Sequence, residues 1–170
     1  MKKIPALLAL LGLLSACTIT IRPSDVTVGV GYGVELNNVI TRLEPDRGVG
    51  AAYYVGDEVR FIITLTQPGY VSLVAIDPDG RTYEFEHGVY LNAGTHVLPL
   101  PGAGHRYIVD YPTGKQRVRA IYTNTRPASV RFQGVYTRER FNERLRIYFR
   151  DCYAETRDVA ETYFYIYSYR

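Results

Sequence analysis

The sequence predicts a mainly β protein, a sandwich or barrel of short antiparallel strands with one amphipathic helix and a last strand near its C-terminal end. Apolar and polar side chains alternate along much of residues 53–122, which is the two-residue period of a strand. Turn-forming residues interrupt this alternation about every eight to twelve residues, as they do in sandwiches and barrels. Beyond residue 136 the apolar period becomes that of a helix.

The alternation is clearest in the segment 59–65, where Val59, Phe61, Ile63 and Leu65 point to one face. Gln67-Pro68-Gly69 ends that run, because proline and glycine favour turn conformations. The next run, 70–77, is largely apolar on both faces, as expected of a central strand, and Asp77-Pro78-Asp79-Gly80 follows it as a tight turn. Together with residues 81–87, these runs predict a meander of three antiparallel strands.

Further strands are expected on both sides of this meander. Residues 26–34 alternate valine with glycine, which we interpret as a strand with a bare face and not as a nucleotide-binding loop, because no helical pattern follows. Residues 36–43 are ambiguous, because Leu36, Val39, Ile40 and Leu43 fit helical spacing whereas residues 39–43 also fit a strand. Later strands are expected at 95–100, 106–110 and 115–122, with residues 111–114 joining the last two as a hairpin loop.

The C-terminal part combines a helix with a strand. One helical stripe contains the apolar side chains of Phe141, Leu145, Tyr148, Phe149 and Cys152, which predicts a helix at about 137–151 with Thr137 as its N-cap. Its polar face carries five arginines, at positions 138, 140, 144, 146 and 150, and is expected to be solvated, although it could also contact anionic lipid headgroups. In the last strand, 158–169, Phe164 and Ile166 oppose a row of tyrosines, namely Tyr163, Tyr165, Tyr167 and Tyr169.

Five segments in the same order resemble a known bacterial family. They read Y-x-V-G-D-E-V-R-F, P-G-Y-V-S-L-V, D-P-D-G, L-N-A-G-T-H-V-L-P and P-T-G-K-Q-R-V-R-A-I-Y-T. Over about residues 39–125 the chain is similar to the domain-of-unknown-function 4384 family. The resemblance implies an immunoglobulin-like antiparallel β-sandwich, found on envelope lipoproteins or beside kinase- and protease-like domains. It implies no catalytic residue.

The N-terminus has the organisation of a lipoprotein signal peptide, expected to span residues 1–16. Lys2-Lys3 precedes an apolar run, Ile4 to Leu14, that is too short for a permanent membrane span. Leu14-Ser15-Ala16-Cys17 resembles the bacterial lipobox. We therefore expect lipidation of Cys17 by a diacylglyceryl group and an amide-linked fatty acid such as palmitate. An ordinary secretory peptide with a chance cysteine is the alternative.

The lipidated cysteine would be a membrane anchor, because two or three acyl chains hold a protein stably where one does not. A tether is expected at residues 17–25, followed by a single β-sandwich domain at 26–170. Thr18 follows the cysteine in place of the aspartate that retains some lipoproteins at the inner membrane, so an outer membrane or cell-surface location is favoured. Without the two leader lysines, the chain has 18 basic and 17 acidic residues, which argues against charge-driven nucleic-acid binding.

The residues with reactive side chains give weak signals. His87, His96 and His105 are the only histidines and lie nine residues apart, so neighbouring strands could gather them into a zinc or copper site. That spacing is not a known metal signature, and no metal or other cofactor is expected. Asp77 and Asp79 lack the further ligands of a calcium loop.

No serine has the setting of a nucleophile, so an enzyme is not expected. Cys152 lies on the apolar helical stripe, where it is expected to be buried. An intermolecular disulfide through Cys152 is the alternative. The sequence thus predicts an envelope lipoprotein that acts as a non-catalytic binding module for a protein or glycan partner. Tyr163, Tyr165, Tyr167 and Tyr169 form its candidate surface. The alternative is a small-molecule or metal sensor or carrier that uses the three histidines.

Overall fold

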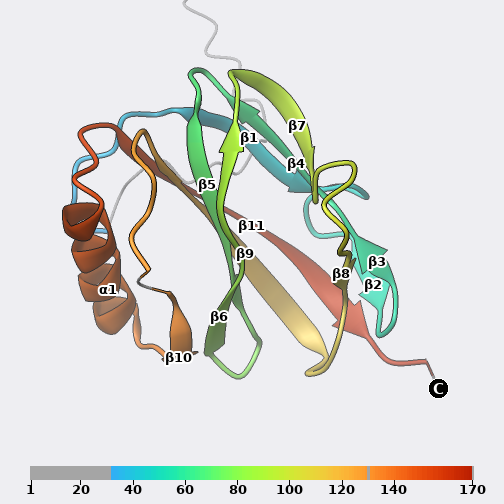
Figure 1. The fold of residues 1–170 in the computed structure, drawn as a ribbon. Helices are drawn as coiled ribbons and strands as arrows, with labels where there is room; N and C mark the ends of the chain where they lie inside the picture. Colours follow the sequence, from blue (N-terminus) through green and yellow to red (C-terminus); the bar gives the residue numbers. More distant parts are fainter. Residues whose placement is uncertain (1–31, 130, 170) are drawn as a thin grey trace, which may run out of the picture.

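The structure is a computed structural model that describes residues 32–129 and 131–169. A small sheet packs across a large one, and a single helix covers part of the outer face of the large sheet (Figure 1). The signal peptide, Cys17 and the tether lie outside the described residues. Among the described residues, no helix is long and apolar enough to cross a membrane.

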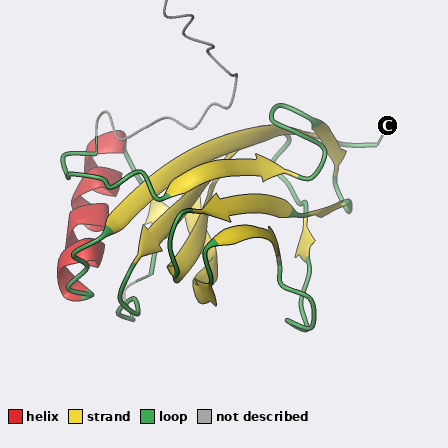
Figure 2. Cartoon of the chain, turned by 90° about the horizontal axis from the view of Figure 1, so that it is seen from above, coloured by secondary structure: helices red, strands yellow, loops and turns green. Residues whose placement is uncertain are grey.

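Three groups of strands make up the fold, and the two main sheets lie face to face (Figure 2). The small sheet has the order β1 (Ile40–Pro45), β4 (Phe61–Leu65) and β7 (Gly94–Leu98). The large sheet has the order β10 (Gln133–Val135), β6 (Arg81–Leu91), β5 (Gly69–Ile76), β9 (Gly114–Thr123), β11 (Arg157–Tyr167) and β2 (Ala52–Tyr54). A separate pair joins β3 (Glu58–Val59) to β8 (Tyr107–Ile108).

The expectation of a mainly β sandwich with one helix and a final strand is confirmed. The main core lies between the two sheets and contains the buried side chains of Phe61, Leu73, Ala120 and Phe164. A second core lies between the large sheet and the helix, where Val74 and Ile121 meet Leu145 and Phe149. Strand β5 is apolar on both faces because each face is covered by a different layer.

The helix α1 (Arg138–Asp151) has the bounds and the orientation that its period predicts. Thr137 is the N-cap, and its side chain accepts a hydrogen bond from the Arg140 backbone N–H. Phe141, Leu145, Tyr148, Phe149 and Cys152 are all buried. The last strand, β11, belongs to the same sandwich, since it pairs antiparallel with β9 over ten residues.

The predicted meander is wrong in its first strand. Strand β4 lies in the small sheet, so only β5 and β6 form a hairpin. The chain changes sheets at Pro68-Gly69, where the Tyr122 hydroxyl donates to the Pro68 carbonyl at 2.7 Å. Alternation cannot distinguish the two arrangements, because a strand buries one face in either sheet.

Three smaller expectations also need correction. Strands β8 and β9 are no hairpin, because β8 pairs with β3 whereas β9 pairs with β5 and β11. The sandwich is not wholly antiparallel, because β2 pairs in parallel with β11. These two strands are far apart in the chain, so no short turn fixes their relative direction. Of the strand expected at 26–34, residues 32–34 form a bend, and the preceding residues lie outside the described part.

Candidate binding surface

The tyrosines of β11 point away from the core, on the outer face of the large sheet. We call the set Tyr54, Tyr163, Tyr165, Tyr167 and Tyr169 the tyrosine face. The side chains of Phe164 and Ile166, which alternate with it, are buried between the sheets. Tyr165, Tyr167 and Tyr169 are 37%, 48% and 69% exposed. The two-residue period of one strand thus gives β11 one buried face and one aromatic surface.

Contacts between rings hold the tyrosine face in place. Tyr54, from the neighbouring strand β2, stacks on Tyr169 with 4.6 Å between ring centroids and lies 6.1 Å from Tyr167. Tyr163 and Tyr165 meet edge to face at 5.9 Å. The Lys115 ammonium lies 3.8 Å above the Tyr163 ring, in cation–π geometry. Rings that are already ordered lose little conformational freedom when a partner binds.

A row of basic side chains runs beside the tyrosine face on β9. We call Lys115, Arg117 and Arg119 the basic row. Its three members lie opposite Tyr165, Tyr163 and Glu161, respectively, in the antiparallel register. Arg119 is the only buried member, and its Nε donates to Glu161 Oε2 at 2.5 Å. The outer face of the sheet therefore combines aromatic rings with positive charge.

The basic row ends in a cavity of about 280 Å³ between the sheet and the first turn of α1. We call it the arginine cavity, because Arg117, Arg119 and Arg138 line it. Phe141 and Tyr32 flank the Arg119 guanidinium, with ring centroids at 4.2 and 5.2 Å. Burial raises the pKa of Tyr32, and the nearby charge of Arg119 opposes that shift.

A second cavity, of about 270 Å³, lies at the end of the sandwich near β3 and β8. Its lining includes the aromatic rings of Phe61, Phe85, Tyr107 and Phe164. The Tyr107 hydroxyl donates to Glu86 Oε2 at 2.5 Å.

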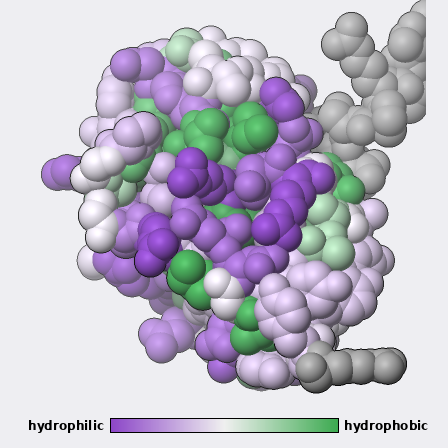
Figure 3. Space-filling model, turned by 90° about the vertical axis from the view of Figure 1, so that its right-hand side faces the viewer, coloured by the Kyte–Doolittle hydropathy of each residue, from purple (hydrophilic) through white to green (hydrophobic). Residues whose placement is uncertain are grey.

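On the side of the molecule seen in Figure 3, hydrophobic residues form small patches separated by hydrophilic ones, so a partner there would meet a mixed surface.

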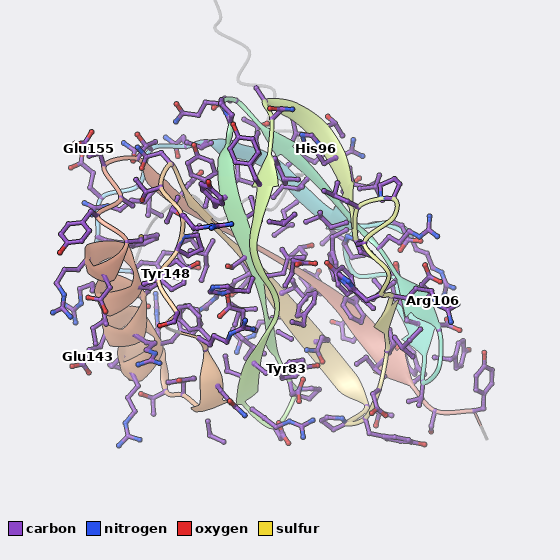
Figure 4. The ribbon with its side chains drawn as sticks, viewed as in Figure 1. Tyr83, His96, Arg106, Glu143, Tyr148 and Glu155 are labelled. Atoms are coloured by element: carbon purple, nitrogen blue, oxygen red, sulfur yellow. The ribbon has the colours of Figure 1, made fainter. Side chains whose placement is uncertain are left out.

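The three histidines have separate partners. His87 Nδ1 lies 2.6 Å from Glu84 Oε1, and His105 Nε2 lies 3.1 Å from Glu86 Oε2. His96, at the edge of the small sheet in Figure 4, has its Nε2 at 2.8 Å from the Asn92 carbonyl. Over residues 32–129 and 131–169, no group of three His, Cys, Asp or Glu side chains is placed to hold a metal ion. The even spacing of the three histidines in the sequence therefore does not bring them together at a metal site.

Asp77 and Cys152, the other two candidate residues from the sequence, both make contacts that stabilise the fold. Asp77 accepts hydrogen bonds from Arg81 Nε at 2.7 Å and from Gln116 Nε2 at 3.0 Å, at the turn between β5 and β6. Cys152 is buried, its Sγ donates to the Phe149 carbonyl at 3.5 Å, and burial raises the pKa of its thiol. A buried neutral thiol is a poor nucleophile and a poor partner for an intermolecular disulfide.

The basic row and the arginine cavity were not identified from the sequence. The run Lys115-Gln116-Arg117-Val118-Arg119 does alternate basic with apolar or amide side chains. Such a run identifies one basic strand face. It does not indicate that Arg138 of the helix reaches the same place.

Comparison with protein families gives one match. Residues 52–126 match the family described as a domain of unknown function, DUF4384. The match covers β2 to β9 and ends before α1 and β11, so most of the tyrosine face lies beyond it. Comparison with curated proteins and with solved structures gave no match.

Proposed function

We propose that this chain is a non-catalytic lipoprotein of the bacterial cell envelope, whose sandwich binds a partner protein through the tyrosine face. Three features of the sequence support the anchor: a positively charged N-terminus, a short apolar run and the segment Leu14-Ser15-Ala16-Cys17. With Cys17 acylated, the domain would stay in water beside an outer membrane or cell surface.

The observation that carries the binding role is the ordered row of exposed rings. Tyrosine combines an apolar ring with a hydroxyl, which is why it is enriched in protein interfaces. Neither the arginine cavity nor the second cavity is lined by Tyr165, Tyr167 or Tyr169. A surface made of several exposed rings, with no cavity in it, suits a protein partner better than a small molecule. A glycan that stacks on the rings is the competing outcome of the capture experiment.

The test begins with the anchor. Cys17→Ser should leave the domain folded but move it from the membrane fraction to the soluble fraction of lysed cells. Cys152→Ser is the matched control and should stay with the membrane, because its thiol is buried in the helix contact. Membrane association that survives Cys17→Ser contradicts the anchor.

The binding role is tested by capture from detergent-solubilised envelope. The acylated chain should recover one protein in a constant ratio, and Tyr165→Ser with Tyr167→Ser should abolish that recovery. Tyr153→Ser, whose ring is 85% exposed on the helix side, is the control and should leave recovery unchanged. Recovery of a polysaccharide in place of a protein, or equal recovery by all variants, contradicts a protein-binding tyrosine face.

A small-molecule carrier is the second candidate, because the second cavity combines apolar and aromatic side chains with a few polar ones, as ligand sites do. His105 is the only histidine among its lining residues, so the three-histidine hypothesis reduces to one side chain. Native mass spectrometry of chain purified without chelators or denaturants should then detect a bound apolar molecule. Bare protein in that spectrum, together with no metal by elemental analysis, contradicts this function.

A further inference from the structure

We infer that the arginine cavity is an anion site, which takes the carboxylate or phosphate group of a molecule docked on the tyrosine face. The inference rests on the proposed function only for the source of that group. The cavity itself is defined by the sheet, by the residues that precede α1 and by the first turn of α1. Thr82, Arg117 and Glu161 line it from three strands of the sheet, and Tyr136 and Arg138 line it from the helix side.

The charges of the lining residues do not cancel. Among the described residues, three arginines line the cavity, and Glu161 is the only acidic one. Glu161 is already paired with Arg119. Within the described part of the chain, the guanidinium groups of Arg117 and Arg138 have no hydrogen-bond or ion-pair partner. Two positive charges therefore meet at one small cavity without a counterion from the described chain.

Arg119 is held in a fixed orientation there. Its side chain is 11% exposed, Glu161 takes its Nε, and the ring of Phe141 lies over its face. Its two terminal nitrogens donate to no group of the described residues. A guanidinium fixed in this way can present two parallel N–H groups, which match the planar fork of a carboxylate or two oxygens of a phosphate.

The end of the helix is not the source of this attraction. Thr137 accepts from the Arg140 backbone N–H. The Glu139 carboxylate accepts from its own backbone N–H and interacts with the Thr137 side chain, and both contacts lower the Glu139 pKa. Some of the backbone N–H groups at the N-terminus of α1 are thus already hydrogen-bonded within the chain. The anion would be held by arginine side chains.

The position of the cavity links it to the tyrosine face. Arg117 lies opposite Tyr163 on the neighbouring strand, so the same two strands carry the cavity at one end and the exposed rings at the other. Arg117 and Arg119 lie opposite positions two and four residues along β11 from the exposed Tyr165. An extended partner segment that stacked on Tyr165 and carried an acidic residue two to four positions farther along would therefore reach the cavity.

The inference is tested by NMR titration of the folded domain with two probes, sodium acetate and inorganic phosphate. At least one probe should cause saturable shifts of the amides of Arg117, Arg119 and Arg138. The double variant Arg117→Gln with Arg138→Gln should weaken binding by roughly tenfold or more, since each removes a charge-assisted contact. Arg140→Gln, on the same helical turn but outside the cavity, should bind as the parent does.

Each result has a defined meaning. Tighter binding of acetate identifies a carboxylate as the ligand group, and tighter binding of phosphate identifies a phosphoryl group. Shifts that never saturate, or equal affinity in the double variant, overturn the anion site. If the double variant still captures the envelope partner as the parent does, the tyrosine face stands and the anionic anchor point falls. If the probes bind the cavity but no partner is recovered, the proposed function fails and the site stands.

Discussion

The hydroxyl of Tyr148 on helix α1 lies 2.9 Å from Ser72 Oγ on strand β5, and both side chains are buried. Ser72 Oγ also accepts from the Gly88 backbone N–H at 2.9 Å. This short chain of hydrogen bonds joins the helix to the β5–β6 hairpin, and Tyr148 points from the helix toward the sheet in Figure 4. Since desolvation disfavours tyrosinate, the pKa of Tyr148 is raised.

Tyr148→Phe should destabilise the domain by about 1 kcal/mol, because the buried Ser72 hydroxyl loses a partner while the ring still fills its space. Ser72→Ala should cost more, since Gly88 N–H then loses its acceptor as well. Denaturant unfolding measures both. Tyr153→Phe, on a ring that is 85% exposed, should leave the midpoint unchanged, and equal midpoints for Tyr148→Phe and the parent would contradict the link.

Gly69→Ala should destabilise the corner where the chain changes sheets. A Cβ at this position would lie 2.4 Å from a carbon of the Tyr122 ring, which is itself fully buried. Overpacking of this kind costs about 1–3 kcal/mol. The free energy of unfolding checks the prediction, and the same substitution in a Tyr122→Leu background should cost less. Equal costs in the two backgrounds would show that the ring is not the obstacle.

Asp158→Ala should loosen the contact between the sheets. Asp158 belongs to β11 of the large sheet, and its Oδ2 accepts from the Ile40 N–H of the small sheet at 2.7 Å. Its other oxygen accepts from Val159 N–H at 2.9 Å. Loss of these acceptors should cost about 2 kcal/mol. Asp158→Asn keeps one oxygen for Ile40 and should cost less. Amide hydrogen exchange at Ile40 provides the local measurement.

Stability should fall as the pH rises above the ordinary pKa of tyrosine. Burial raises the pKa of Tyr83 to about 12 and shifts Tyr53, Tyr107 and Tyr148 in the same direction. Between pH 10 and 12 the unfolded chain therefore releases protons that the folded chain retains, and the free energy of unfolding decreases. Unfolding curves across this range test the sign. Tyr83→Phe should reduce the slope, and a flat profile would contradict it.

The local structure of several elements follows from the sequence. The period of Phe141, Leu145 and Tyr148 identified α1 and its buried stripe, because a helix packs one face and its N-cap needs a side-chain acceptor such as Thr137. The alternation of Tyr163 to Tyr167 with Phe164 and Ile166 identified a strand with one exposed aromatic face. The turn at Asp77-Pro78-Asp79-Gly80 also follows from local preferences, and Gly80 N–H bonds the Asp77 carbonyl at 2.9 Å.

The partners of these elements depend on contacts that local pattern does not encode. The alternation along Phe61–Leu65 is the same in either sheet, so the sheet change at Gly69 appears only with Tyr122 packed against it. The even spacing of the histidines suggests proximity, yet His87 lies in the large sheet and His96 in the small one.

Side-chain period and turn residues act over a few neighbouring positions, so they were enough to predict a β protein with a tyrosine-bearing last strand and a C-terminal amphipathic helix. The meeting of Arg138 of the helix with Arg117 and Arg119 at one cavity could be seen only in the folded chain. Their meeting depends on how α1 docks on the large sheet, and that docking depends on the packing of Val74, Ile121 and Val159 under the helix. Such packing joins residues from distant parts of the chain, so no short window of sequence contains it.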